Sequence, residues 1–181
     1  MMLRNSTTAY GLIAKLLHWV IAVQIFALVW LGWYMVDLTY FDRWYNASLT
    51  WHKSLGMLVL ALAVIKLGWL LASPEPALSP SLARWQRAAA KATHHALVTM
   101  LVLVPVTGYL ISTSAGKGVS VFGWLEIPAV VPASRQLRDL AIAAHYYLAY
   151  GTAIVAAVHA LAALKHQLVD RDGTLARMLW R

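Results

Sequence analysis

Apolar residues gather into four long stretches, which are separated by polar, charged or proline-rich segments. The stretches cover approximately residues 12–36, 52–72, 94–113 and 143–168. A helix of roughly 20 apolar residues, rising ~1.5 Å per residue, crosses the ~30 Å hydrocarbon layer of a bilayer. The pattern therefore predicts an all-α integral membrane protein, an up-and-down four-helix bundle that forms a single membrane domain over residues 1–181.

The segments between these stretches are predicted to be loops. Residues 37–50 are polar and rich in Tyr, Phe and Trp, which settle where membrane meets water. Pro74, Pro76 and Pro80 argue against a helix in the second connection. Residues 112–140 are rich in Gly and Pro and predict a loop of about 29 residues, a length that is more often functional than idle in a compact bundle.

The fourth stretch contains two histidines, His145 and His159, which are 14 residues apart. At ~100° per residue, 14 steps fall about 40° short of four full turns, so both rings lie on one helix face about 21 Å apart along its axis. The residues between them on this face, Ala149, Thr152 and Ala156, are small. They leave room for a large, flat group at two stacked levels.

The same spacing recurs in the first two stretches. Gly32 follows His18 by 14 residues, and Lys66 follows His52 by 14 residues. Each of these helices therefore offers one histidine at one level of the bundle. At its other level, the first helix offers open space beside Gly32.

Positive charge is unevenly divided between the two sides of such a bundle. Four spans place both termini and the connection between the second and third spans on the same side. Ten of the 15 Lys and Arg residues lie on that side: Arg4, Lys15, Lys66, Arg84, Arg87, Lys91, Lys165, Arg171, Arg177 and Arg181. Cytoplasmic loops carry the excess of positive residues, so both termini are predicted to be cytoplasmic. This orientation accounts for the net charge of +8 without nucleic acid binding.

Depth in the membrane then divides the histidines into two pairs. His18 and His159 both lie near the cytoplasmic side, whereas His52 and His145 both begin their helices at the outer side. Each histidine taken alone can be explained by a hydrogen bond to a neighbouring helix, although polar groups at bilayer depth are costly. Two pairs at matched depths instead predict two bis-histidine haems about 20 Å apart, which form an electron path across the membrane.

Other polar residues of the spans keep more than one interpretation. Lys66 either reaches the lipid headgroups or faces the bundle and pairs with a haem propionate. His94 and His95 are adjacent, so at most one of them faces a given site, and an interfacial or supporting role is favoured over axial ligation. His166 is predicted to lie at headgroup level.

Composition narrows the chemistry further. Of the 181 residues, 61% are hydrophobic, and the mean hydropathy is +0.63, whereas soluble domains are typically ~45–50% apolar. Cysteine is absent, which excludes disulfides, thiolate metal sites and covalent haem attachment through Cys-x-x-Cys-His. Two haem b groups would therefore be held without a covalent bond to the porphyrin.

Short motifs spread along the chain match a known family. They are Tyr10, Leu17-His18-Trp19, Trp51-His52-Lys53-Ser54-Leu55-Gly56, Val104-Pro105-Val106-Thr107-Gly108-Tyr109, Phe122-Gly123, His145, His159 and Arg171-Asp172-Gly173-Thr174-Leu175. This ordered set resembles the bacterial cytochrome b561 family. The resemblance implies a four-helix, multi-pass protein of the bacterial inner membrane with two b-type haems, whose axial ligands would be His18, His52, His145 and His159. Lys66 stands where this family commonly has arginine, and lysine can still supply the charge.

The resemblance also implies electron transfer with the quinone pool, and one activity of the family is superoxide oxidation coupled to ubiquinone reduction. Four cations on the outer side would draw in such an anion, or would simply anchor loops: Lys53, Lys117, Arg135 and Arg138. The alternative is a membrane electron-transfer subunit whose haems serve a redox partner protein. A haem-free transporter or metal carrier, with the histidines as relay sites, predicts a colourless protein. Expected partners are membrane lipid, quinone and, in the alternative, that redox protein.

Overall fold

The computed structural model describes residues 2–79 and 81–179, so Pro80 and Arg181 lie outside the described residues. Four long helices make up most of the fold: α1 (Leu12–Val36), α2 (Tyr45–Ala72), α3 (Arg84–Thr113) and α4 (Arg135–Lys165). A π-helical turn (His166–Asp170) continues α4, and a short helix α5 (Thr174–Leu179) follows it. Strands β1 (Val119–Val121) and β2 (Leu125–Ile127) form an antiparallel hairpin between α3 and α4.

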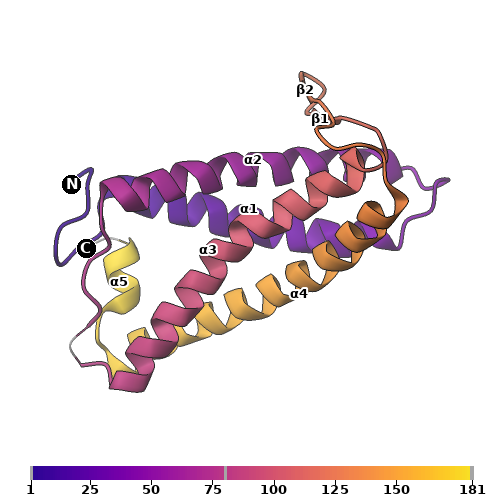
Figure 1. Cartoon of the computed structure of the whole chain (residues 1–181). Helices are drawn as coiled ribbons and strands as arrows, with labels where there is room; N and C mark the ends of the chain where they lie inside the picture. Colours follow the sequence, from indigo (N-terminus) through magenta and orange to yellow (C-terminus); the bar gives the residue numbers. More distant parts are fainter. Residues whose placement is uncertain (1, 80, 180–181) are drawn as a thin grey trace.

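Each of the four long helices is long and apolar enough to cross a membrane, with a mean hydropathy of 1.7 to 2.3 over its most apolar part. They run up and down along one bundle (Figure 1). Both termini lie at one end of it, here called the terminal end, and the hairpin lies at the other, the hairpin end. The prediction of an all-α four-helix membrane bundle is confirmed.

The outer surface of the bundle is apolar, as a lipid-facing surface requires. Trp30 on α1 and Ile154 and Leu161 on α4 each expose more than 60% of their surface. The tightly buried cluster is small and consists of Ile21, Val59, Ala63 and Leu101, contributed by the first three helices. Helix α3 packs closely on α4, whereas α1 and α4 make few contacts. The interior is therefore not filled as tightly as a soluble core would be.

The helices begin earlier than the apolar stretches do. α2 starts at Tyr45, α3 at Arg84 and α4 at Arg135. Hydropathy marks the part of a helix that lies in hydrocarbon, whereas polar turns can continue the helix beyond it. The expected loop over 112–140 is consequently shorter, because its last part forms the first turns of α4 and its centre forms the hairpin. The membrane boundaries of the four spans stay a prediction.

The terminal end is closed by contacts among three segments. The side-chain amide of Asn5 donates to the carbonyl of Ser73 at 3.0 Å, and Arg177 on α5 donates to the carbonyl of Ala77 at 3.0 Å. Burial in this cap raises the pKa of Tyr10 to about 12, an effect that Glu75 strengthens and Arg177 opposes. The N-terminal segment, the connection after α2 and α5 therefore form one folded layer.

Candidate functional site

The structure brings the four predicted histidines together as two pairs. The ring centroids of His18 on α1 and His159 on α4 are 6.3 Å apart, with an interplanar angle of 61°. Those of His52 on α2 and His145 on α4 are 6.1 Å apart, at 76°. The first pair lies toward the terminal end and the second toward the hairpin end, as the depth argument predicts.

These separations suit a metal ion held between two rings. Two imidazoles that each bind one ion through a nitrogen at ~2.0–2.1 Å have centroids roughly 6 Å apart. Direct packing of two aromatic rings also covers this range, so distance alone does not decide the matter. The surroundings of each ring carry the rest of the argument.

An apolar cavity of about 530 Å³ lies beside the His52/His145 pair, a size typical of ligand sites. All four long helices line it, for example through Val29 of α1, Val59 of α2 and Leu101 of α3. From α4 come the small residues Ala149 and Thr152, which lie between the two histidines of that helix as the spacing predicts. The cavity could hold the apolar body of a porphyrin with imidazole nitrogen at its edge.

Two glycines allow the histidine rings to approach neighbouring helices. A Cβ atom at Gly32 would lie 3.1 Å from Cε1 of His52, and one at Gly108 would lie 3.0 Å from Cε1 of His145. Both distances are tighter than ordinary carbon contacts. The open space predicted beside Gly32 is therefore where the His52 ring lies, and Gly108 does the same for His145 on α3.

The two rings of this pair are held differently. Nδ1 of His145 lies 3.0 Å from the carbonyl oxygen of Val104 and 3.2 Å from the hydroxyl of Thr107. Nδ1 of His52 is buried, and no residue in 2–79 or 81–179 hydrogen-bonds it. His145 is thus oriented with Nε2 left for another ligand, whereas the plane of His52 is set by packing alone.

His94 lies in the other pair's site, which sequence reasoning missed. Its ring centroid is 5.3 Å from that of His159, at an interplanar angle of 67°. The available signal was a further 14-residue spacing, because His94 precedes Gly108 on α3 by the interval that separates His145 and His159. His95 turns away and places Nδ1 2.7 Å from the Lys91 carbonyl.

Lys66 is half-buried and lies within electrostatic range of His18 and His94. This position is compatible with the interpretation that it faces the bundle, and its contact with a propionate stays a prediction. His166, expected at headgroup level, places Nδ1 2.7 Å from the carboxylate of Asp170. It lies outside both histidine pairs.

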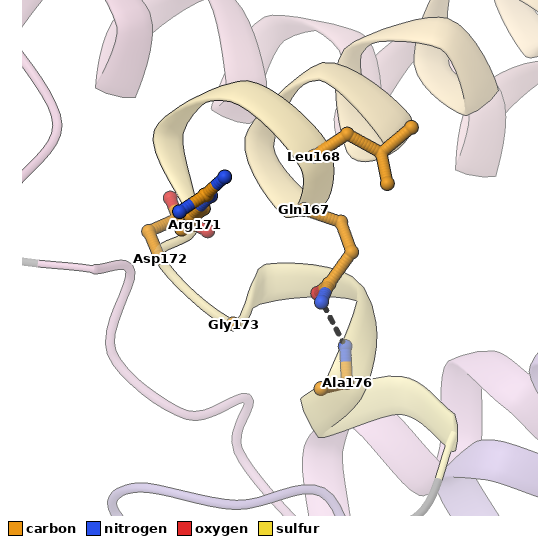
Figure 2. A pocket seen from close by; sticks show the side chains of 6 residues that line it. All are labelled: Gln167, Leu168, Arg171, Asp172, Gly173 and Ala176. Atoms are coloured by element: carbon orange, nitrogen blue, oxygen red, sulfur yellow. Dashed lines mark hydrogen bonds between the residues drawn. The ribbon is translucent and has the colours of Figure 1, made fainter.

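A separate hollow of about 480 Å³ lies at the terminal end, between the π-helical turn and α5 (Figure 2). The side-chain oxygen of Gln167 accepts a hydrogen bond from the amide of Ala176 at 3.3 Å across it, and Asp172 accepts one from the amide of Thr174 at 2.9 Å. Arg171 has a left-handed φ of 52°. The Arg171–Leu175 motif thus builds the turn that docks α5, and the hollow contains no residue of the two pairs.

Comparison with known proteins decides the family. The family model for prokaryotic cytochrome b561 matches residues 9–181. The chain belongs to the prokaryotic cytochrome b561 family. It is 40% identical over 175 residues to cytochrome b561 homolog 2 of Escherichia coli (strain K12), covering 97% of this chain and 93% of that relative.

More distant members of the cytochrome b561 family differ in name. The chain is 30% identical over 165 residues to the probable superoxide oxidase CybB of Yersinia pestis, covering 90% of this chain and 91% of the relative. Cytochrome b561 homolog 1 of Escherichia coli (strain K12) is 28% identical over 169 residues, with 91% and 93% covered. Membership in the family implies haem b binding and electron transfer in a multi-pass protein of the bacterial inner membrane.

Proposed function

We propose that the chain holds two haem b groups, one between His18 and His159 and one between His52 and His145. The observation that carries this proposal is the presence of two imidazole pairs, 6.3 and 6.1 Å apart, at two levels of the same helix. Bound haem supplies a centre that accepts and releases one electron at a time. With both axial positions occupied by imidazole, oxygen has no vacant site on the iron, which favours electron transfer over oxygen chemistry.

The protein's own residues have three tasks in this proposal. The histidines supply the axial nitrogens, and the apolar walls exclude water from the path between the two levels. Because the chain has no cysteine, packing and axial ligation alone retain the haems. Lys66 supplies a positive charge close to the His18/His159 pair.

We further propose that the terminal end is cytoplasmic and that the chain is a superoxide:ubiquinone oxidoreductase. Each superoxide would lose one electron at the outer side and leave as O₂; two such electrons and two protons convert one ubiquinone to ubiquinol. Four cations gather toward the hairpin end: Lys53, Lys117, Arg135 and Arg138. Lys53 and Lys117 lie close enough to repel one another, and such a field attracts a small anion. The name of the Yersinia pestis relative supports the same activity.

A second candidate is an electron-transfer subunit that serves a partner protein. Phe41 in the connection after α1 and Trp124 at the tip of the hairpin are 95% and 94% exposed, respectively. Large exposed aromatic side chains on the outer side suit the centre of a protein interface. They suit the membrane interface equally well.

One assay separates the two candidates. The detergent-purified chain is supplied with superoxide and ubiquinone, with no other protein present, and ubiquinol formation is followed. Quinone reduction driven by superoxide supports the oxidoreductase. A haem-loaded protein that is indifferent to superoxide supports the partner subunit instead. His145→Ala, which removes one of the two proposed haem sites, serves as the control for electron passage through the chain.

A further inference from the structure

The two histidines of the hairpin-end pair differ in what holds them, and the difference originates in one segment of α3. Thr107 donates its hydroxyl proton to the carbonyl of Val104 at 2.7 Å, a bond that threonine commonly makes within a helix. Nδ1 of His145 lies 3.2 Å from this hydroxyl oxygen and 3.0 Å from the same carbonyl. One N–H of the imidazole is therefore shared between two oxygens that are themselves hydrogen-bonded.

The geometry selects a single tautomer and a single ring plane for His145. A neutral imidazole has one N–H, and the two acceptors beside Nδ1 place the proton there, which leaves the lone pair on Nε2 for iron. Gly108 then allows the ring to lie against α3, because a Cβ at that position would lie 3.0 Å from Cε1 of His145. Residues 104–108 thus form a cradle for this one side chain.

His52, on the opposite side of the same site, has no comparable support. Its Nδ1 is buried without a hydrogen-bond partner anywhere in the described part of the chain. The ring lies against Gly32, which contributes space and no acceptor. Control over the electron donation of this pair therefore falls on His145.

We propose that Thr107 is a positioning residue that acts on the hairpin-end haem through His145. Its hydroxyl accepts from Nδ1–H, fixes the ring plane and makes Nε2 a stronger electron donor, which stabilises ferric over ferrous iron. The hydroxyl thereby lowers the reduction potential of that haem. This inference rests on the proposed function, since it requires haem between His52 and His145.

The test compares Thr107→Val with Thr107→Ser. Valine keeps the shape and removes the hydroxyl, whereas serine restores it. Thr113→Val is the matched control, because Thr113 is a buried threonine of the same helix whose hydroxyl donates to the Tyr109 carbonyl at 3.1 Å, away from the cavity. Midpoint potentials are measured by redox titration, and ligand geometry by the g-values of the low-spin ferric signals. The hairpin-end signal is assigned as the one that His52→Ala removes.

Thr107→Val is expected to shift the midpoint potential of the hairpin-end haem to a more positive value and to change its g-values, while the other haem is unaffected. Thr107→Ser should return both readouts to those of the unaltered protein. Loss of the hairpin-end haem in Thr107→Val with recovery in Thr107→Ser would also support a positioning role.

Unchanged potential and g-values in Thr107→Val would overturn the inference, as would an equal change in Thr113→Val. A negative shift would overturn it as well, because the hydroxyl would then act mainly by withdrawing electron density from the Val104 carbonyl. These failures differ from failure of the proposed function, in which His52→Ala and His145→Ala would leave both haem signals in place.

Discussion

His18 and His159 lie at opposite ends of the sequence, yet their rings are 6.3 Å apart at the terminal end of the bundle. The relationship arises because α1 and α4 run antiparallel, so that a histidine near the start of one meets a histidine near the end of the other. His159 contacts His94 as well, with 5.3 Å between their ring centroids. The predictions below follow from these two histidine pairs and their neighbours.

Single alanine variants should remove the haems selectively. His52→Ala and His145→Ala are each expected to abolish the haem at the hairpin end and to leave the other partly loaded, because an axial bond is lost at one level only. His18→Ala and His159→Ala should do the reverse. Low-temperature difference spectra of the purified variants distinguish the two haems. Loss of both to the same degree in every variant would contradict the pairing.

Gly108→Ala should displace the ring of His145. A Cβ placed 3.0 Å from Cε1 must push the ring or α3 aside, and overpacking of this kind costs roughly 1–3 kcal/mol. We expect a lower content of the hairpin-end haem and a lower melting temperature for Gly108→Ala. Gly68→Ala is the control, because a Cβ there meets nothing within 4 Å. Equal effects of the two substitutions would show that His145 does not depend on Gly108.

His94→Ala should retain both haems and alter the spectrum of the one at the terminal end. His94 contacts His159 and lies beside the pair, so its removal changes the surroundings of an axial ring without removing an axial bond. Absorbance and haem content of this variant are compared with those of His18→Ala. If His94→Ala abolished a haem while His18→Ala did not, the assignment of His18 would be wrong.

Replacing Lys117, Arg135 and Arg138 together by glutamine should slow superoxide oxidation on the order of tenfold at low salt. The difference should shrink as the Debye length falls from ~30 Å at 0.01 M to ~8 Å at 0.15 M salt. Stopped-flow kinetics over this range provide the measurement. The control replaces three cations of the opposite end, Arg84, Lys91 and Arg171. Equal rates for both triple variants would remove the steering argument.

Periodicity along single helices predicted much of this arrangement. The 14-residue interval between His145 and His159 placed both rings on one face of α4, and depth alone paired them with His52 and His18. The interval from His18 to Gly32 likewise located the space that the ring of His52 uses. Each of these inferences needs only the pitch of a helix and the direction of the chain.

Contacts between helices were not predictable in the same way. The bond from His145 to the Val104 carbonyl depends on how α4 lies against α3, which hydropathy and spacing along one helix do not specify. The position of His94 was missed because two adjacent histidines leave their facing undecided until the rotation of α3 is known. The early start of α4 at Arg135 was missed because polar turns outside the bilayer carry no apolar signal.

The measurement that tests the central claim most directly is the haem-to-protein ratio of the detergent-purified chain by pyridine haemochrome assay. The account predicts two haem b groups per chain, one for each histidine pair. A ratio of one would contradict the electron path between two levels of the bundle, and a colourless protein would contradict haem binding by these histidines altogether.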